Sequence, residues 1–216
     1  MATLPRFAKS GSDWITNDLL AYNIIVSSQI PETFYDEALP AVASLTGVDR
    51  YLLYGSPHTQ GLSDETLRLL EYLDLALVQA SSDIILLPVI QGDTTTVDPE
   101  PQVIASAIAT FQYNNRIRAR LGEEQLDSMT IPCITMIGTL PIFYLVPVTR
   151  ELSEAVFTEQ HPPSTTKVDK CVVVSFFGRL REGMENVGFR QAALQHYTTF
   201  RSLASIHWSA FTIRDR

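Results

Sequence analysis

The sequence is poor in the residues that build cross-linked or metal-bound proteins. Its 216 residues include only two cysteines and four histidines. Cys133 and Cys171 each stand in an apolar run, so we expect buried free thiols rather than a disulfide. The scattered histidines make no zinc-binding pattern with them. We therefore expect no metal and no cofactor.

Long hydrophobic runs and export signals are missing too. No run approaches the roughly 18 apolar residues of a membrane-spanning helix. The start, MATLPRFAKSGSDW, lacks the apolar core of a signal peptide, so a cytoplasmic protein with no membrane partner is expected. The length fits one domain over 1–216, with a mostly helical region over 1–80 and a sheet-containing core over 81–216. The oligomeric state is left open.

Lysine is scarce, and the charge is unevenly distributed. The net charge is −8, and 13 of the 16 cationic residues are arginine. Residues 1–100 hold 14 acidic and 4 basic residues, whereas 101–216 hold 10 and 12. The acidity argues against nonspecific nucleic-acid binding by the whole surface, but a local basic face on the second half remains possible. Phosphate-loop, dinucleotide-binding, serine-hydrolase and zinc-peptidase motifs are absent.

The apolar pattern predicts alternating strands and helices. A short strand is expected at 24–26, and DIILLPVI (83–90) reads as another, near an edge or bulged because Pro88 removes a ladder donor. Asp98 and Pro99 predict a helix start, and Gly122 its end. A hairpin over 131–148, a short helix capped by Thr149, a strand at 170–177 and a helix over 186–208 follow. This order indicates an α/β (mixed α+β) fold, with a small mixed sheet flanked by helices.

One basic segment, FQYNNRIRAR (111–120), is a candidate binding surface. Arg116, Arg118 and Arg120 contribute three positive charges without an acid. Tyr113, Arg116 and Arg120 share a helix face by their spacing. Arginine beside an aromatic ring can hold phosphate and stack a base, so these four residues are the predicted RNA-binding set. The alternative is a solvated last turn, where cations complement the helix dipole.

The C-terminal segment also combines arginines with aromatic residues. Arg190 and Arg201 accompany His196, Tyr197 and Trp208 there. Packed beside the first cluster, these residues would extend a basic aromatic face. We favour the other reading, in which Tyr197 and Trp208 belong to the core or its rim.

Four phrases together resemble a large basidiomycete family: SDWITNDLLAYNIIV, LRLLEYLDLAL, DPEPQVIASAIATFQYNNR and IPCITMIGTLPIFYLVPVTREL. The resemblance implies a restriction-endonuclease-like core of the PD-(D/E)xK type. Such nucleases use acidic residues to hold Mg²⁺ and a lysine to position or activate water.

The chain departs from that pattern at the turn Gln91-Gly92-Asp93-Thr94. Glycine stands where the resemblance implies a metal-binding glutamate, and threonine where it implies the lysine. The segment between 78 and 82 is also shorter than the resemblance implies. Asp93 alone cannot hold a catalytic magnesium well. The core is therefore expected to be degenerate, without the nuclease constellation.

Small ribosome-inactivating toxins of mushrooms, which are of about this size, give a further resemblance. It implies an RNA-directed enzyme that removes an adenine from ribosomal RNA, the expected partner together with other nucleic acids. Asp93 and Glu100 are the candidate catalytic carboxylates. Two alternatives stay open: a non-catalytic binding or storage protein, and residual Mg²⁺-dependent nuclease activity.

Overall fold

A five-stranded mixed sheet organises the chain. The computed structural model describes residues 10–45, 88–92, 98–174, 183–184 and 186–211. The strand order is β1-β5-β4-β3-β2. The strands span Ile24–Ser28 (β1), Val89–Gly92 (β2), Ser128–Ile137 (β3), Leu140–Thr149 (β4) and Thr166–Val172 (β5). The helices span Thr16–Ala21 (α1), Pro31–Tyr35 (α2), Glu100–Arg120 (α5), Arg150–Phe157 (α6) and Val187–Phe211 (α7), with short 3₁₀ turns at Gly11–Asp13 (η1) and Val42–Ser44 (η2).

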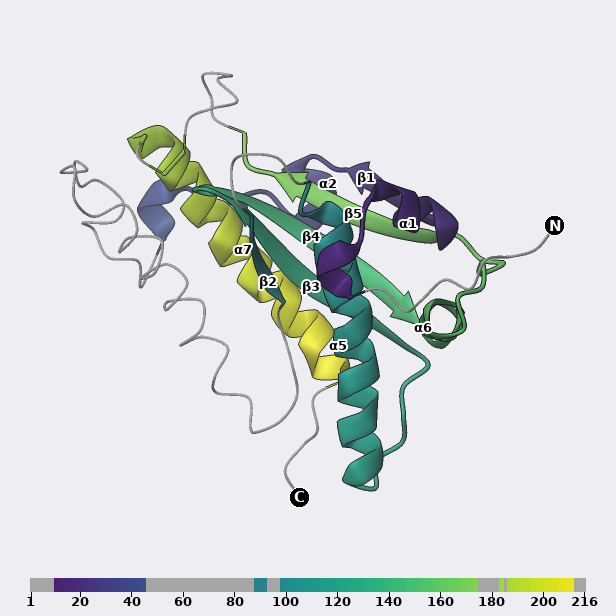
Figure 1. Cartoon of the computed structure of the whole chain (residues 1–216). Coiled ribbons are helices and arrows are strands. Elements are labelled where there is room, and N and C mark those ends of the chain that lie inside the picture. The colour runs from purple at the N-terminus through teal and green to yellow at the C-terminus, as the bar shows by residue number, and fades with distance from the viewer. Residues whose placement is uncertain (1–9, 46–87, 93–97, 175–182, 185, 212–216) are drawn as a thin grey trace.

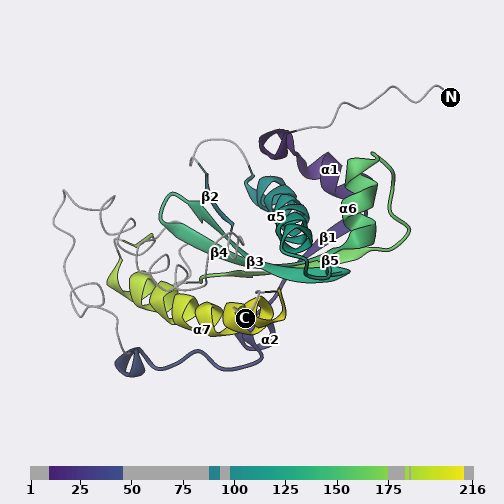
Figure 2. The same ribbon diagram turned by 90° about the horizontal axis from the view of Figure 1, so that it is seen from below.

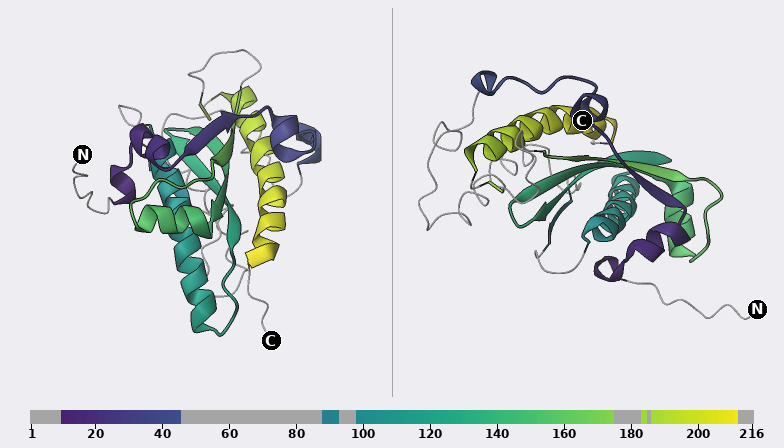
Figure 3. Two further views of the ribbon diagram at one scale, coloured as in Figure 1. Left: turned by 90° about the vertical axis from the view of Figure 1, so that its right-hand side faces the viewer. Right: turned by 90° about the horizontal axis from the view of Figure 1, so that it is seen from above.

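Helices cover both faces of the sheet. Figure 2 shows α1, α5 and α6 on one side and α2 and α7 on the other. The two longest helices, α5 and α7, lie across opposite faces (Figures 1 and 3). A buried apolar cluster fills each interface: one contains Ile104 and Ile108 of α5, and the other contains Phe189 and Phe200 of α7. The predicted α/β class, with a small mixed sheet between helices, is confirmed.

The β3–β4 hairpin is the best-paired part of the sheet. Its ten antiparallel pairs run from Ser128↔Thr149 to Ile137↔Leu140. The turn needs only Gly138 and Thr139, and Gly138 has a φ of 60°, which glycine adopts without strain. Thr149 Oγ1 then accepts the Leu152 N–H at 3.1 Å, so the predicted cap begins α6. Both sequence predictions are confirmed here.

Helix α5 connects β2 to β3, which are parallel neighbours. Asp98 Oδ1 accepts the Glu100 N–H at 3.0 Å, but the N-cap position falls on Pro99, one residue later than predicted, and the helix begins at Glu100. At the other end, Gly122 has a φ of 75°, as expected of a glycine that ends a helix. Pro88 immediately precedes β2, which lies at the edge of the described sheet, as its position predicted.

The N-terminal segment contributes an edge strand. β1 pairs with β5 in parallel, from Ile24↔Thr166 to Ser28↔Lys170, which confirms the predicted strand. β5 begins at Thr166, four residues earlier than predicted. The segment LRLLEYLDLALVQA (67–80), whose leucine spacing predicts an amphipathic helix, lies outside the described residues. Within those residues, none of the helices has the length and apolar character needed to cross a membrane.

Candidate functional site

Glu100 begins α5 and is held there by the packing of that helix. Val103, Ile104 and Ala107 follow on the buried face and fix the helix against the sheet. The Glu100 side chain keeps 14% of its surface exposed. A carboxylate in the first turn of a helix also meets the positive end of the helix dipole. The first turn of α5 therefore presents a fixed and partly shielded anion.

Lys170 approaches this carboxylate from β5. Its Nζ atom lies 2.5 Å from Oε2 of Glu100, and its side chain is 25% exposed. Lys170 is held by two neighbours, because β5 pairs with β1 through Ser28 and with β4 through Tyr144. The pair thus joins a helix start to a central strand. We call Glu100 and Lys170 the acid–lysine pair.

A buried phenol lies beside the acid–lysine pair. Tyr144 is 1% exposed. Burial raises the pKa of its phenol; the Thr135 hydroxyl opposes this shift, and the carboxylates of Glu100 and Asp98 add to it. Tyr144 is therefore a neutral hydroxyl at physiological pH. It can donate a hydrogen bond near the pair, but its ring is too buried to stack a base.

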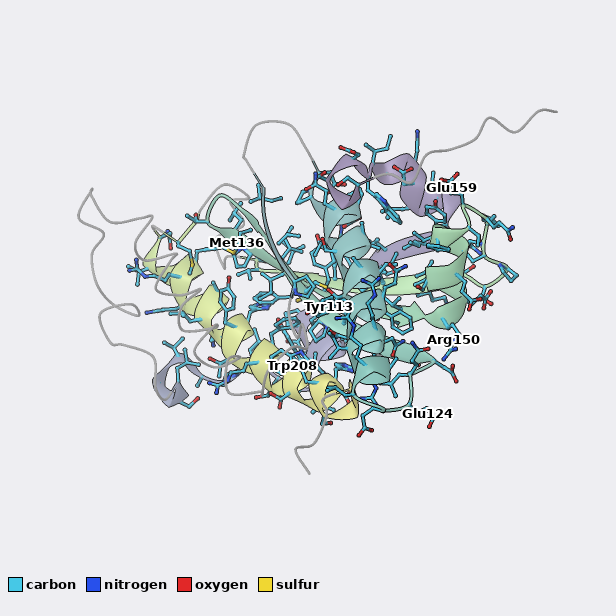
Figure 4. All side chains as sticks on the ribbon, turned by 60° about the horizontal axis from the view of Figure 1, so that its bottom comes forward. Tyr113, Glu124, Met136, Arg150, Glu159 and Trp208 are labelled. Atoms are coloured by element: carbon cyan, nitrogen blue, oxygen red, sulfur yellow. The ribbon has the colours of Figure 1, made fainter. Side chains whose placement is uncertain are left out.

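Three of the four predicted RNA-binding residues share an exposed face of α5. Tyr113 is 37% exposed, and Arg116 and Arg120 are exposed as well. Figure 4 shows Tyr113 on α5 and Trp208 on α7. Neither Arg116 nor Arg120 forms an ion pair with another described residue. We call Tyr113, Arg116 and Arg120 the arginine face.

Arg118 does not belong to the arginine face. Its side chain is buried, with 9% exposed, and its Nε donates to the Glu124 carbonyl at 2.8 Å. It therefore holds the chain that follows α5 and presents no guanidinium to a phosphate. The prediction that Arg118 belongs to the RNA-binding set is therefore wrong, and the reason is geometric. Residue 118 lies two positions from both 116 and 120, so it points to a different side of the helix.

The candidate carboxylate and the arginine face are far apart. Glu100 and Arg116 are 16 residues apart on one helix, which at 1.5 Å per residue is about 24 Å. The two sets of residues therefore do not line one cleft. Asp93, the other candidate carboxylate, lies outside the described residues. The same holds for all of residues 93–97.

The aromatic residues of the tail are core residues, as favoured from the sequence. Tyr197 is 2% exposed and donates to Met136 Sδ at 3.1 Å, and Trp208 is 8% exposed. Arg190 is buried as well, with Nη1 donating to the Met184 carbonyl at 3.1 Å. Of the cations predicted there and described, only Arg201 is exposed. The tail does not extend the arginine face.

A cysteine and a histidine meet in the core but form no nucleophile. His196 Nδ1 lies 3.0 Å from the Tyr35 hydroxyl and 3.8 Å from Cys171 Sγ. Burial raises the pKa of the Cys171 thiol to about 11 and lowers the pKa of His196 to about 4. A neutral thiol beside a neutral imidazole is a packed hydrogen-bonded cluster. Both cysteines are free and buried, as predicted.

Lys170 is the functional candidate that the sequence did not reveal. It lies 70 positions from Glu100, and the strand that carries it reads as an ordinary apolar run. Its one local signal is that only three lysines occur in the chain. Among the described residues, no group of three or more potential ligands could hold a metal ion. The chain matches no family model, and comparison with curated proteins and with solved structures finds no match either.

Proposed function

We propose that this protein is an RNA-directed N-glycosidase that releases adenine from ribosomal RNA in the cytoplasm, and that the acid–lysine pair does the chemistry. One observation carries the proposal: a carboxylate and an ammonium group meet at 2.5 Å on the first turn of α5, partly exposed to a ligand. Hydrolysis of an N-glycosidic bond needs a base for water, an acid for the leaving adenine and an anion for the cationic sugar. The pair supplies all three.

The reaction is balanced by two proton transfers with the substrates and a third within the pair. Water attacks C1′ of the ribose while the bond from C1′ to the adenine nitrogen breaks. Glu100 takes a proton from the water, and its negative charge stabilises the oxocarbenium-like transition state before that transfer. Lys170 gives a proton to the departing adenine. A proton then passes from Glu100 to Lys170, whose heavy atoms are in hydrogen-bond contact, and the pair regains its starting charges.

The arginine face fits the proposal as a separate binding surface. A single strand with bases stacked about 3.4 Å apart would span the 24 Å to Glu100 with roughly seven nucleotides. Arg116 and Arg120 would contact phosphates, and Tyr113 would stack a base. Adenine would be presented unstacked at the acid–lysine pair, since chemistry on a base requires it to leave the stack.

The scaffold fits the resemblance noted in the sequence. A strand, a helix and a parallel strand follow one another in β2, α5 and β3. In a degenerate nuclease-like core, this is the unit that would once have carried the metal site. We propose that the acid–lysine pair replaced that chemistry at the same end of the helix.

The test is depurination of purified ribosomes, read as an RNA fragment released by aniline. The wild-type chain should produce the fragment. Glu100→Gln and Lys170→Met should each lower the rate by about 10²–10⁴, the range for one general acid or base. Glu124→Gln, an exposed carboxylate near the far end of α5, is the matched control and should leave the rate unchanged. No aniline-sensitive site with wild-type protein would refute the proposal.

A second candidate is a Mg²⁺-dependent nuclease, favoured by one observation. Carboxylate–lysine contact is the arrangement that such nucleases use, and here β5 supplies the lysine that the turn lacks. RNA or plasmid cleavage that disappears with EDTA and with Asp93→Ala would establish it. Binding of RNA without either activity would leave the non-catalytic alternative.

A further inference from the structure

The sheet divides at one end. β4 and β5 are paired from Ile142↔Val172 only as far as Leu145↔Asp169. Yet β4 continues to Thr149, paired with β3, and β5 extends back to Thr166, paired with β1. Pro147 has no N–H to offer a neighbouring strand, and it lies two residues beyond the last pair. The two halves of the sheet therefore separate and leave a fork between β4 and β5.

A pocket occupies this fork. Its volume is about 380 Å³, at the small end of the range for ligand sites. Its apolar lining comes from Pro147, Leu152 and Pro162. Around them stand hydroxyl and charged groups from the end of β4, the start of α6 and the start of β5: Thr149, Glu151, Ser164, Thr165, Thr166 and Lys167. A lining that combines apolar and polar groups suits a small ring that carries hydroxyl groups.

The carboxylate of this pocket is held in place. Ser164 donates its N–H to Glu151 Oε1 at 3.2 Å and its hydroxyl to Oε2 at 3.1 Å. Each oxygen keeps a lone pair, because a carboxylate accepts about four hydrogen bonds. Glu151 is exposed, so a ligand hydroxyl can reach it. A fixed acceptor facing a pocket is typical of sites that recognise hydroxyl groups.

The cation of this pocket is not engaged. Lys167 is exposed and forms no ion pair or side-chain hydrogen bond with another described residue. It lines the same pocket as Thr149, which caps α6. The Thr149 hydroxyl accepts from Leu152 and keeps its own proton to donate. The lysine and this hydroxyl favour an anionic group on the ligand, while Glu151 favours its hydroxyls.

The pocket is separate from the acid–lysine pair. Neither Glu100 nor Lys170 lines it. Lys167 and Lys170 are three residues apart on β5, so their side chains leave opposite faces of the strand. A ligand in the fork would therefore bind without contacting the proposed catalytic groups.

We propose that the fork between β4 and β5 binds a small anionic sugar: a ring of monosaccharide size with a carboxylate or a phosphate. Lys167 and Thr149 hold the anionic group, and Glu151 accepts from ring hydroxyls. Pro147 and Pro162 pack against the apolar face of the ring. The site is independent of the proposed RNA chemistry.

Calorimetric titration of the full chain with defined probes tests this. Glucuronate carries a carboxylate on a sugar ring, and glucose 6-phosphate carries a phosphate on one. Glucose has the ring and its hydroxyls without the anion, and inorganic phosphate has the anion without the ring. At least one charged sugar should bind more tightly than glucose and phosphate, and comparing the two sugars identifies the anion. Lys167→Met should weaken that binding about tenfold or more, the worth of a charged hydrogen bond.

Glu151→Gln should weaken binding of both the charged sugar and glucose. Glu154→Gln is the matched control, since Glu154 is exposed on the same helix but does not line the pocket. Circular dichroism and urea unfolding establish that each variant is folded. The proposal is overturned if no probe binds folded wild-type protein, or if binding is unaffected by both pocket variants.

Discussion

Oε2 of Glu100 and Nζ of Lys170 lie 2.5 Å apart, although 70 positions separate the two residues in the chain. The contact ties the first turn of α5 to the central strand β5. It is the feature on which the proposed chemistry depends. We also expect it to contribute to stability, independently of any activity.

Breaking the acid–lysine pair should destabilise the fold. The pair is neither fully buried nor freely exposed, so Glu100→Gln or Lys170→Met should each lower the free energy of unfolding by about 1–3 kcal/mol. The double variant should lose less than the sum, because the second change removes a charge already unpaired. Urea unfolding of the four proteins gives the coupling energy. Strict additivity would show that the contact contributes nothing in solution.

Nucleic-acid binding should depend on the arginine face and on salt. Arg116→Ala and Arg120→Ala should each weaken binding to single-stranded RNA and lower the slope of log K against log salt by about 0.7. Tyr113→Ala should cost about 1–3 kcal/mol of binding with little change of slope. Arg201→Ala, an exposed arginine on α7, is the control. Fluorescence anisotropy at several salt concentrations measures both quantities, and equal effects from Arg201→Ala would contradict the assignment.

Stability should fall as the pH falls from 6.5 to 4. Burial lowers the pKa of His196 from 6.5 to about 4, so in this window the unfolded chain binds a proton that the folded chain does not. The stability present above pH 6.5 is thus lost towards pH 4, by on the order of 3 kcal/mol. Urea unfolding across this range checks it. His196→Gln should weaken the dependence of the unfolding free energy on pH. Burial lowers the pKa of His207 too, so a smaller pH dependence of the same sign should remain. An unchanged pH dependence in His196→Gln would show that other groups cause it.

Asn115 should be the most sensitive polar residue of α5. Its Oδ1 accepts the Leu126 N–H and its Nδ2 donates to the Leu126 carbonyl, both at 2.9 Å, while its side chain is buried. Asn115→Ala leaves two backbone groups without their partner and should cost about 2–4 kcal/mol of unfolding free energy. Gln125→Ala removes only a long hydrogen bond of 3.4 Å from an exposed residue and should cost less than about 0.5 kcal/mol. Comparable losses in thermal or urea unfolding would contradict this account.

Local signals predicted most of the elements, and non-local contacts decided the site. Asp98, Gly122, Thr149 and Gly138 act through their own backbone neighbours, so their roles could be read from the chain. Lys170 could not be assigned, because its partner is set by the register between β5 and β4 and by where α5 begins. The burial of Arg118 was missed for a similar reason. Its carbonyl partner at Glu124 exists only once the chain turns back at Gly122.

The sequence pattern did not predict the pocket in the fork either. Thr149 was predicted as a cap, and Lys167 belonged to no predicted element. Their proximity follows from the point at which β4 and β5 stop pairing, which depends on the register of two strands separated by α6. The alternation of apolar residues along a strand predicts which side chains point into the core. It does not predict where two neighbouring strands stop pairing.

The parallel pairing of β1 with β5 has a consequence for how the chain reaches its native state. Gln29, just after β1, hydrogen-bonds to Asp169 of β5 across 140 positions of sequence. During synthesis the first strand leaves the ribosome long before its only described neighbour exists. Contacts of such high sequence separation slow folding, and a waiting apolar strand is exposed to aggregation. We therefore expect the sheet to be completed only after β5 has been synthesised, and the yield of folded protein to fall when expression is fast or warm.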